Sequence, residues 1–375
     1  MVYLDYSATT PIDKRVLESF ERTSLEYIGN PNSLHSEGMK AKKLMDAANE
    51  QIASILKVKN NEIIFTSGAS ESNNLAILGV VNKYKDRGKT IITTKFEHSS
   101  ILECVNYLEK NGYNIKYVKI DEFGQVDLQD LEKKIDDDTI LVSICEVNSE
   151  IGIKQDVNKI GEFLKKYPRV IFHVDGTQAV GKKDINLENI DLYSFSGHKI
   201  YGPKGIGVLV KKENIEIEPM IHGGKSQTIY RAGTPPLALI VAISRALRLI
   251  TDDLEYNTAY VSDLNKKLID GLKKINGVII NSNNYSIPHI VNISVQDIKP
   301  ETLLHALDED EIYISTKTAC STDDISIPVL EFTKDEAMAK SSLRISLSHL
   351  TKENEIDFFL EKLKENIEKL QSIRN

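Results

Sequence analysis

A lysine near the middle of the chain stands among several other side chains that can take part in chemistry. Lys199 follows a serine and a histidine and precedes a tyrosine, within the run SFSGHKIYGPKGIG at positions 194–207. Glycine and proline constrain this loop, and a lysine held away from water can lose its charge and form a Schiff base with an aldehyde. The same run would also fit a surface turn with a solvated lysine. The other loops of the chain must decide between the two interpretations.

The composition excludes several classes of protein. The 375 residues exceed what one hydrophobic core usually serves and indicate two domains. Charges of both signs are interspersed, with 47 Lys and Arg against 55 Asp and Glu, so we expect no broad contact with nucleic acid. Three cysteines, at positions 104, 145 and 320, have the spacing of neither a disulfide framework nor a zinc site. No run of ~18 apolar residues could span a membrane, and the first residues do not resemble a signal peptide. We therefore expect a cytoplasmic protein without a membrane partner.

Strand-sized apolar runs alternate with helical patterns in the first half of the chain. The runs lie at 62–66, 90–94, 114–118, 139–145 and 170–174, and the helical patterns between them at 70–87, 98–111, 127–135 and 156–167. This alternation predicts an α/β fold whose mostly parallel sheet is covered by helices on both faces. Ligands of such sheets bind beyond the carboxyl ends of the strands, where the loops lie.

The pattern changes after residue 250. We expect a helix at 255–275, strands near 277–281, 289–294, 311–315 and 342–347, a helix near 300–308 and a final amphipathic helix. These elements predict a smaller α+β domain. The expected division is a large domain over residues 15–250 and a small domain formed by residues 1–14 together with 251–375.

Three loops that follow predicted strands carry residues suited to bind an anion or a planar ligand. Residues 66–74 open a helix with small side chains, where an anion could meet backbone N–H groups, or where a plain helix cap could form. His98 could lie flat on a planar ligand, move protons or only cap the next helix. Asp175 ends a buried strand and needs a partner, which either a protonated ring nitrogen or a structural arginine would supply.

Two residues in the second half of the chain could bind or carry a substrate group. Cys320 lies in a polar loop and is expected to be exposed, whereas Cys104 and Cys145 are expected to be core residues. Arg344 lies inside an apolar strand and should pair with a carboxylate, of the protein or of a substrate. Residues 219–226 end like a P-loop, but a proline replaces its first glycine, so we expect no nucleoside-triphosphate site.

Taken together and in this order, the loops resemble those of the cysteine desulfurases of the NifS/IscS kind, which are pyridoxal 5′-phosphate enzymes of aminotransferase class V. The resemblance runs from YLDYSATTP at positions 3–11 to the final helix and includes SGHKIYGPKG at 196–205. It implies the transferase fold type I. In that architecture a large domain has a mostly parallel sheet of seven strands flanked by helices, and a smaller α+β domain follows.

The resemblance assigns roles around the cofactor. Lys199 would bind it covalently and carry the substrate's α-proton, and His98 would stack on its ring and take part in catalysis. Asp175 would face the ring nitrogen and keep it protonated, and Gln178 would lie near the ring's phenolic oxygen. The residues implied for the phosphate are Ala69, Ser70, Ser196 and His198.

Further roles concern the substrate and the neighbouring subunit. Arg344 would bind the α-carboxylate of L-cysteine with Asn148 nearby, and Cys320 would take the sulfur as a persulfide. Thr234 would reach the phosphate in the neighbouring subunit, which implies a homodimer. The resemblance implies no resident metal, with Cys320 at most a transient ligand of an iron–sulfur cluster.

The sequence departs from the family pattern in three places. Ser149 replaces the second of two asparagines, which normally contacts the ring oxygen. We therefore expect the bound cofactor to titrate differently with pH. The run from Lys225 to Ala232 lacks the usual glutamate and a glycine. The stretch between Cys320 and Arg344 is also shorter than in the long-loop members.

The function implied is cysteine desulfuration, in which L-cysteine becomes L-alanine. The sulfur would pass to an acceptor protein for iron–sulfur cluster assembly or tRNA thiolation. Two alternatives remain open: another class V enzyme such as a selenocysteine or cysteine-sulfinate lyase, or a partner-binding relative that has lost catalysis.

Overall fold

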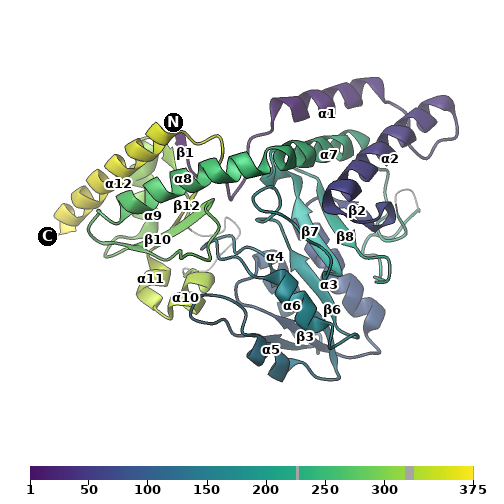
Figure 1. Ribbon diagram of the computed structural model, residues 1–375, viewed down its shortest axis with the longest axis horizontal. Coiled ribbons are helices and arrows are strands. Elements are labelled where there is room, and N and C mark those ends of the chain that lie inside the picture. Colours follow the sequence, from purple (N-terminus) through teal and green to yellow (C-terminus); the bar gives the residue numbers. More distant parts are fainter. Residues whose placement is uncertain (225–227, 317–324, 375) are drawn as a thin grey trace.

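The computed structural model describes residues 1–224, 228–316 and 325–374, and it contains a central sheet of seven strands (Figure 1). In spatial order the strands are β2 (Ile63–Thr66), β8 (Gly207–Lys211), β7 (Leu192–Ser196), β6 (Ile171–Asp175), β5 (Thr139–Cys145), β3 (Thr90–Thr93) and β4 (Asn114–Tyr117). β8 runs antiparallel to both of its neighbours, and the other pairs are parallel. The predicted α/β fold with a mostly parallel sheet is confirmed.

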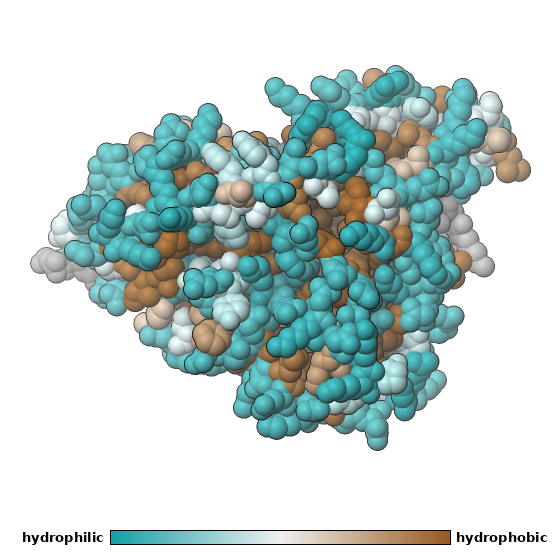
Figure 2. All heavy atoms as spheres, viewed as in Figure 1, coloured by the Kyte–Doolittle hydropathy of each residue, from teal (hydrophilic) through white to brown (hydrophobic). Residues whose placement is uncertain are grey.

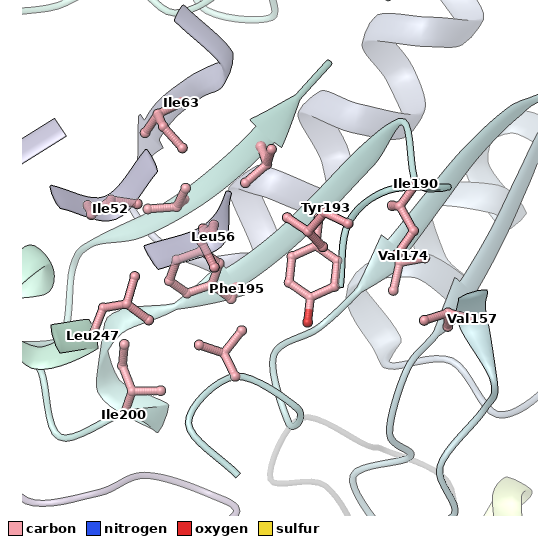
Figure 3. Packing of buried hydrophobic residues seen from close by; sticks show 14 of the residues in the cluster. Ile52, Leu56, Ile63, Val157, Val174, Ile190, Tyr193, Phe195, Ile200 and Leu247 are labelled. Carbon is pink, nitrogen blue, oxygen red and sulfur yellow. The ribbon is translucent and has the colours of Figure 1, made fainter. Parts of the chain in front are cut away.

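Helices cover both faces of this sheet because successive strand residues point in opposite directions. One hydrophobic cluster joins strand residues to α2 (Ser36–Leu56), α6 (Val157–Leu164) and α7 (Leu237–Asp252), and Ile63 of β2 belongs to it. Ile64 belongs instead to a second cluster, with α3 (Ala69–Tyr84) and α4 (Ser99–Lys110). Figure 3 shows Phe195 of β7 together with Ile52 and Leu247, which belong to the same cluster. α7 was not among the predicted helices.

A second group of elements lies beside the sheet (Figure 1). Its antiparallel sheet contains β9 (Val278–Ile280), β10 (Ile290–Val295) and β12 (Ser342–Ser346), and β1 (Val2–Tyr3) pairs with β11 (Ile312–Tyr313). The accompanying helices are α8 (Leu254–Leu272), α9 (Pro300–Glu309), α10 (Ile327–Thr333), α11 (Glu336–Lys340) and α12 (Glu353–Arg374). Val2 and Leu4 share a hydrophobic cluster with this group. The domain boundaries at 14/15 and 250/251 stay a prediction.

Four further elements are α1 (Lys14–Glu26), α5 (Leu128–Lys134), the 3₁₀ turn η1 (Asn60–Glu62) that precedes β2 and the 3₁₀ turn η2 (Gly197–Lys199) that follows β7. α1 packs on α7. In the described ranges, no helix combines the length and the apolarity that crossing a membrane would require. Hydrophilic side chains cover most of the face seen in Figure 2, with apolar patches between them.

Two buried histidines should make the fold sensitive to acid. Burial lowers the pKa of His173 to about 4 and that of His289 to about 3. In the unfolded chain, histidine has a pKa of about 6.5. The stability that these neutral histidines contribute is therefore fully present above that pH, and it is lost as the pH falls toward 4. We expect the free energy of unfolding to lose about 1 kcal/mol per pH unit for each of these histidines, measured by urea unfolding from pH 7 to 4.

A matched pair of variants checks this expectation. His289→Gln should flatten the pH dependence, whereas His305→Gln should leave it unchanged because His305 is exposed. Glu97 acts in the opposite sense, since burial raises its pKa to about 8 and the folded state then keeps a proton that the unfolded state loses. Equal slopes in the two histidine variants would contradict the prediction.

Candidate active site

A cavity of about 590 Å³ opens at the carboxyl ends of three neighbouring strands. Cys145, Asp175 and Ser196, the last residues of β5, β6 and β7, contribute to its wall. The start of α3 and the N-terminal residues 7–9 close other sides. The cavity therefore lies at the position where ligands of parallel sheets bind.

Lys199 lines this cavity at the end of η2. Its Nζ donates to the backbone oxygen of Ala8 at 2.7 Å and to that of Ser7. Neither carbonyl carries a negative charge, and the side chain is only half-exposed. The amine is thus held at the cavity wall by the N-terminal segment, which differs from a solvated lysine on a surface turn.

The start of α3 forms one end of the cavity. Gly68 is the N-cap of this 16-residue helix and supplies no side-chain capping bond, and Ala69 and Ser70 follow it at the cavity wall. Ser196 and His198 face the same cavity from the loop after β7. Backbone N–H groups at a helix start favour an anion. The structure brings together the residues that were expected to hold a phosphate.

His198 is uncharged at neutral pH. Its Nδ1 lies 3.1 Å from Oγ1 of Thr9. Burial lowers its pKa to about 4, and the positive charges of Lys199 and Lys204 act in the same direction. A neutral imidazole can still donate one hydrogen bond to an anion.

Asp175 presents a buried carboxylate to the cavity. Its Oδ2 accepts a hydrogen bond of 2.9 Å from Nδ2 of Asn73, and its Oδ1 accepts one of 2.9 Å from the backbone N–H of Thr177. Among the described residues it has no ion-pair partner, so no structural arginine neutralises it there. The carboxylate is therefore available to a protonated group of a ligand.

His98 is both a helix cap and part of the cavity wall. Its Nδ1 accepts from the backbone N–H of Ser100 at 3.1 Å, which makes it the N-cap of α4. Burial lowers its pKa below the ordinary value, with the Lys199 charge contributing. The cap fixes the ring at the cavity, so the two interpretations of His98 are compatible.

Gln178 and Arg344 line the cavity on the side of the N-terminal segment. The Nε2 of Gln178 donates to the backbone oxygen of Ser7 at 2.9 Å. Arg344 is almost fully buried and pairs with Asp5 through a bond of 2.8 Å from Nη2 to Oδ1. Among the described residues, its Nε has no hydrogen-bond partner. Arg344 thus meets a carboxylate of the protein, one of the two partners that its position in a strand predicted.

Ser149 and Asn148 are placed differently. Ser149 lines the cavity, and its backbone oxygen accepts a 3.0 Å bond from Nη1 of Arg344. Asn148 does not line the cavity, because its Nδ2 donates to the backbone oxygen of Phe96 and its Oδ1 accepts from the N–H groups of Glu150 and Ile151. These bonds hold the loop and tie the Asn148 side chain to the protein backbone.

Of the two expected site residues still to be placed, one lies outside the described residues and the other lies away from the cavity wall of its own chain. Cys320 lies outside the described residues, as do positions 225–227 of the altered run. Thr234 is exposed and does not line the cavity of its own chain. In the described ranges, no cluster of His, Cys, Asp and Glu could hold a metal ion.

The sequence interpretation missed several residues that contact the site. The backbone of residues 7–9, the Asp5 carboxylate and the amide of Asn73 were not singled out. Asn73 stands one turn after Ala69 in the helix that opens the anion loop, and this spacing could have indicated it. No local sequence feature indicates that the N-terminal segment lies at the cavity, because β1 reaches its place by pairing with β11 about 310 residues later.

Comparison with known proteins now gives the family. The model of the class-V aminotransferase family matches residues 2–359. The cysteine desulfurase IscS of Neisseria meningitidis serogroup C (strain 053442) is 39% identical and aligns with 99% of this chain and 93% of its own length.

Solved structures agree with this result. A NifS-like protein superposes with a TM-score of 0.92 at 37% identity, over 97% of this chain and 98% of that one. SspA, solved in complex with cysteine, gives a TM-score of 0.82 at 32% identity, over 94% of this chain and 100% of that one. The resemblance to cysteine desulfurases and the fold expected from it are confirmed, and the chain belongs to the class-V aminotransferase family.

Proposed function

We propose that this protein is a cysteine desulfurase that converts L-cysteine to L-alanine and takes the sulfur onto Cys320. The observation that carries the proposal is one cavity lined by an amine, a carboxylate and a guanidinium, supplied by Lys199, Asp175 and Arg344. The 39% identity to a cysteine desulfurase IscS and the likeness to SspA in complex with cysteine support the substrate.

The cavity fits pyridoxal 5′-phosphate, the cofactor that cysteine desulfurases of this family use. The uncapped start of α3, with Ser196 and His198, suits the phosphate, and the unpaired Asp175 carboxylate suits a protonated ring nitrogen. Lys199 would bind the aldehyde carbon. When bound, the cofactor supplies a ring that stores the charge left on the substrate's α-carbon.

The chain's own residues position the substrate and move its α-proton. Arg344 would exchange part of its contact with Asp5 for the substrate α-carboxylate, and its Nε, which no described residue contacts by a hydrogen bond, offers a further donor. The Nζ of Lys199 takes the α-proton and later returns one to the carbon skeleton. His98, neutral at pH 7, would pack on the ring without adding charge.

The sulfur step transfers one atom between two thiols. The Sγ of Cys320, as a thiolate, forms a bond to the substrate sulfur while the bond between that sulfur and the β-carbon breaks. The electron pair of the broken bond stays with the carbon skeleton, which gains protons to become alanine. L-Cysteine and the Cys320 thiol thus give L-alanine and a Cys320 persulfide.

Replacing Gly207 with alanine should weaken the phosphate end of the site. A Cβ at position 207 would lie 2.6 Å from the Cα of Gly68 and 2.8 Å from the backbone oxygen of Phe195. Backbone atoms cannot rotate aside, so we expect a loss of about 1–3 kcal/mol in the free energy of unfolding. We also expect weaker binding of pyridoxal phosphate, because the displaced Gly68 is the N-cap of α3.

Urea unfolding and cofactor titration of the apo protein check both effects. Gly224→Ala is the matched control, since its Cβ would lie within 4 Å of none of the described atoms. Gly207→Ala protein that matches the control in both measurements would contradict the prediction.

Two copies of this chain would associate, with Thr234 reaching the cofactor of the partner, and would deliver sulfur to an acceptor protein in the cytoplasm. The support within the chain is a set of large exposed apolar side chains where α1 leads into α2, namely Leu25, Ile28, Leu34 and Met39. Sedimentation velocity tests the dimer. The acceptor, an iron–sulfur scaffold or a tRNA-thiolation enzyme, is tested by transfer of ³⁵S from the persulfide.

The decisive experiment compares two cysteine variants in a sulfide-release assay with L-cysteine and a reductant. Cys320→Ala should abolish sulfide release, while Cys104→Ala should retain it because Cys104 is buried in the core. Wild-type protein with no visible cofactor band would overturn the proposal. A band without sulfide from L-cysteine would leave another class V reaction or a partner-binding role.

A further inference from the structure

A buried lysine lies behind the cavity wall, outside the residues that the proposed reaction uses. Lys182 is 8% exposed, and its Nζ donates to Oε1 of Gln178 at 2.7 Å. Among the described residues, no carboxylate lies within ion-pair distance of this ammonium. Burial lowers its pKa to about 7, and the charges of Lys199 and Arg344 contribute. A buried cation without a counter-ion is costly, so its single contact calls for an explanation.

The contacts of Gln178 with Ser7 and Lys182 fix the orientation of its side-chain amide. A carbonyl oxygen can only accept, so the bond to the Ser7 oxygen requires the Nε2 side of Gln178 there. Lys182 then donates to the Oε1 side. A flipped amide would set oxygen against oxygen at Ser7, and it would set the amide nitrogen against the protonated amine of Lys182, which can only donate. Both contacts therefore select the same orientation.

Among the described residues, this orientation leaves one N–H of Gln178 without a partner. Nε2 carries two hydrogens, and one of them is bonded to Ser7. Gln178 lines the cavity, and the same Ser7 oxygen also accepts from Nζ of Lys199. The second N–H is thus a donor held at the cavity close to the reactive amine.

We propose that Lys182 is a positioning residue that holds Gln178 so that its amide N–H donates to the phenolic oxygen of pyridoxal phosphate. The inference rests on the proposed function, because the phenolic oxygen belongs to that cofactor. A donor at this oxygen favours its anionic form and thereby lowers the pH at which the Lys199-bound cofactor loses its proton. The charged or titratable groups facing Lys182 are Lys199, Arg344, His198 and His289.

The test is a pH titration of the cofactor's visible absorbance in the holoenzyme without substrate. Lys182→Met should raise the midpoint by about one pH unit, and Lys182→Arg, which keeps a donor, should restore it. Lys85→Met, which changes an exposed lysine at the C-cap of α3, should titrate like the wild type. Thermal unfolding of each variant shows that the fold is retained.

The Gln178→Ala variant shows whether Lys182 acts through Gln178 or directly through its own charge. Gln178→Ala should raise the midpoint by a similar amount, and adding Lys182→Met to it should change little further. A Lys182→Met midpoint equal to the wild type, or an undiminished shift in the Gln178→Ala background, would overturn the inference. Absence of a visible band in the wild type would instead overturn the proposed function.

Discussion

Lys199→Ala protein is expected to bind pyridoxal phosphate without a covalent bond and to lose desulfurase activity by at least about 10²–10⁴-fold. Two tasks fall on the Nζ of this residue, the covalent attachment and the movement of the α-proton. In the structure the amine already faces the cavity, held by the carbonyls of Ser7 and Ala8. Alanine removes both functions but leaves the phosphate end of the site intact.

A second cavity lysine provides the matched control. Lys204 also lines the cavity but is exposed. After borohydride reduction, mass spectrometry should find the cofactor on the peptide that contains Lys199 in both the wild type and Lys204→Ala. Cofactor trapped on Lys204, or sulfide release retained by Lys199→Ala, would contradict the assignment.

The architecture was predictable because most strands of the central sheet are short, apolar and buried on both faces, with β4 as the exception. Every residue of β5 is buried, and the run 139–145 marks this strand in the sequence with the same bounds. Helices with one apolar stripe, such as α4, were equally clear. α7 was missed although its sequence, LALIVAISRALRLITD, favours a helix, because its pattern follows two prolines and no strand precedes it directly.

The site was predictable where a loop follows its strand directly. Asp175 ends a predicted strand, so the topology alone brings it to the edge of the sheet where ligands bind. Ser196 ends β7 and Lys199 follows it, but β7 was not among the predicted strands, and both residues were identified from the composition of their loop and from the family resemblance. Contacts that depend on distant pairing were not predictable. Asp5 meets Arg344 only because the N-terminal segment pairs with elements more than 300 residues away, with a bridge from Asp5 to Ser346 beside it.

Asn148 and Lys182 show a second limit of sequence reasoning. Asn148 matches a family motif, yet its side chain makes three hydrogen bonds to the protein backbone, two within its own loop and one to the oxygen of Phe96. Lys182 matches no motif that we recognised, although it stands four residues after Gln178 and contacts it. Residue type and spacing identify candidates, but only the hydrogen-bond partners show which side chains remain available to a ligand.

Asp175→Asn is expected to slow alanine formation strongly. Asp175→Asn preserves the shape of the side chain and removes its charge, so the ring nitrogen loses the anion that keeps it protonated. We expect the rate of alanine formation to fall by about 10²–10³-fold, the loss typical of removing one electrostatic stabiliser from an active site. Covalent binding of the cofactor should persist, because Lys199 is unchanged.

The neighbours of Asp175 sharpen this expectation. Its two oxygens accept from Asn73 and from the N–H of Thr177, and an asparagine can accept at only one of these positions. The variant therefore places an amide N–H against one of the two donors, and the loop after β6 should lose some rigidity as well as charge.

Asp191→Asn is the matched control for a buried carboxylate away from the cavity. Asp191 accepts from the backbone N–H of Phe172, and burial raises its pKa above the ordinary value. Its loss should therefore change stability but not the rate of alanine formation. If Asp175→Asn and Asp191→Asn form alanine equally fast from L-cysteine while both retain bound cofactor, Asp175 does not face the ring nitrogen.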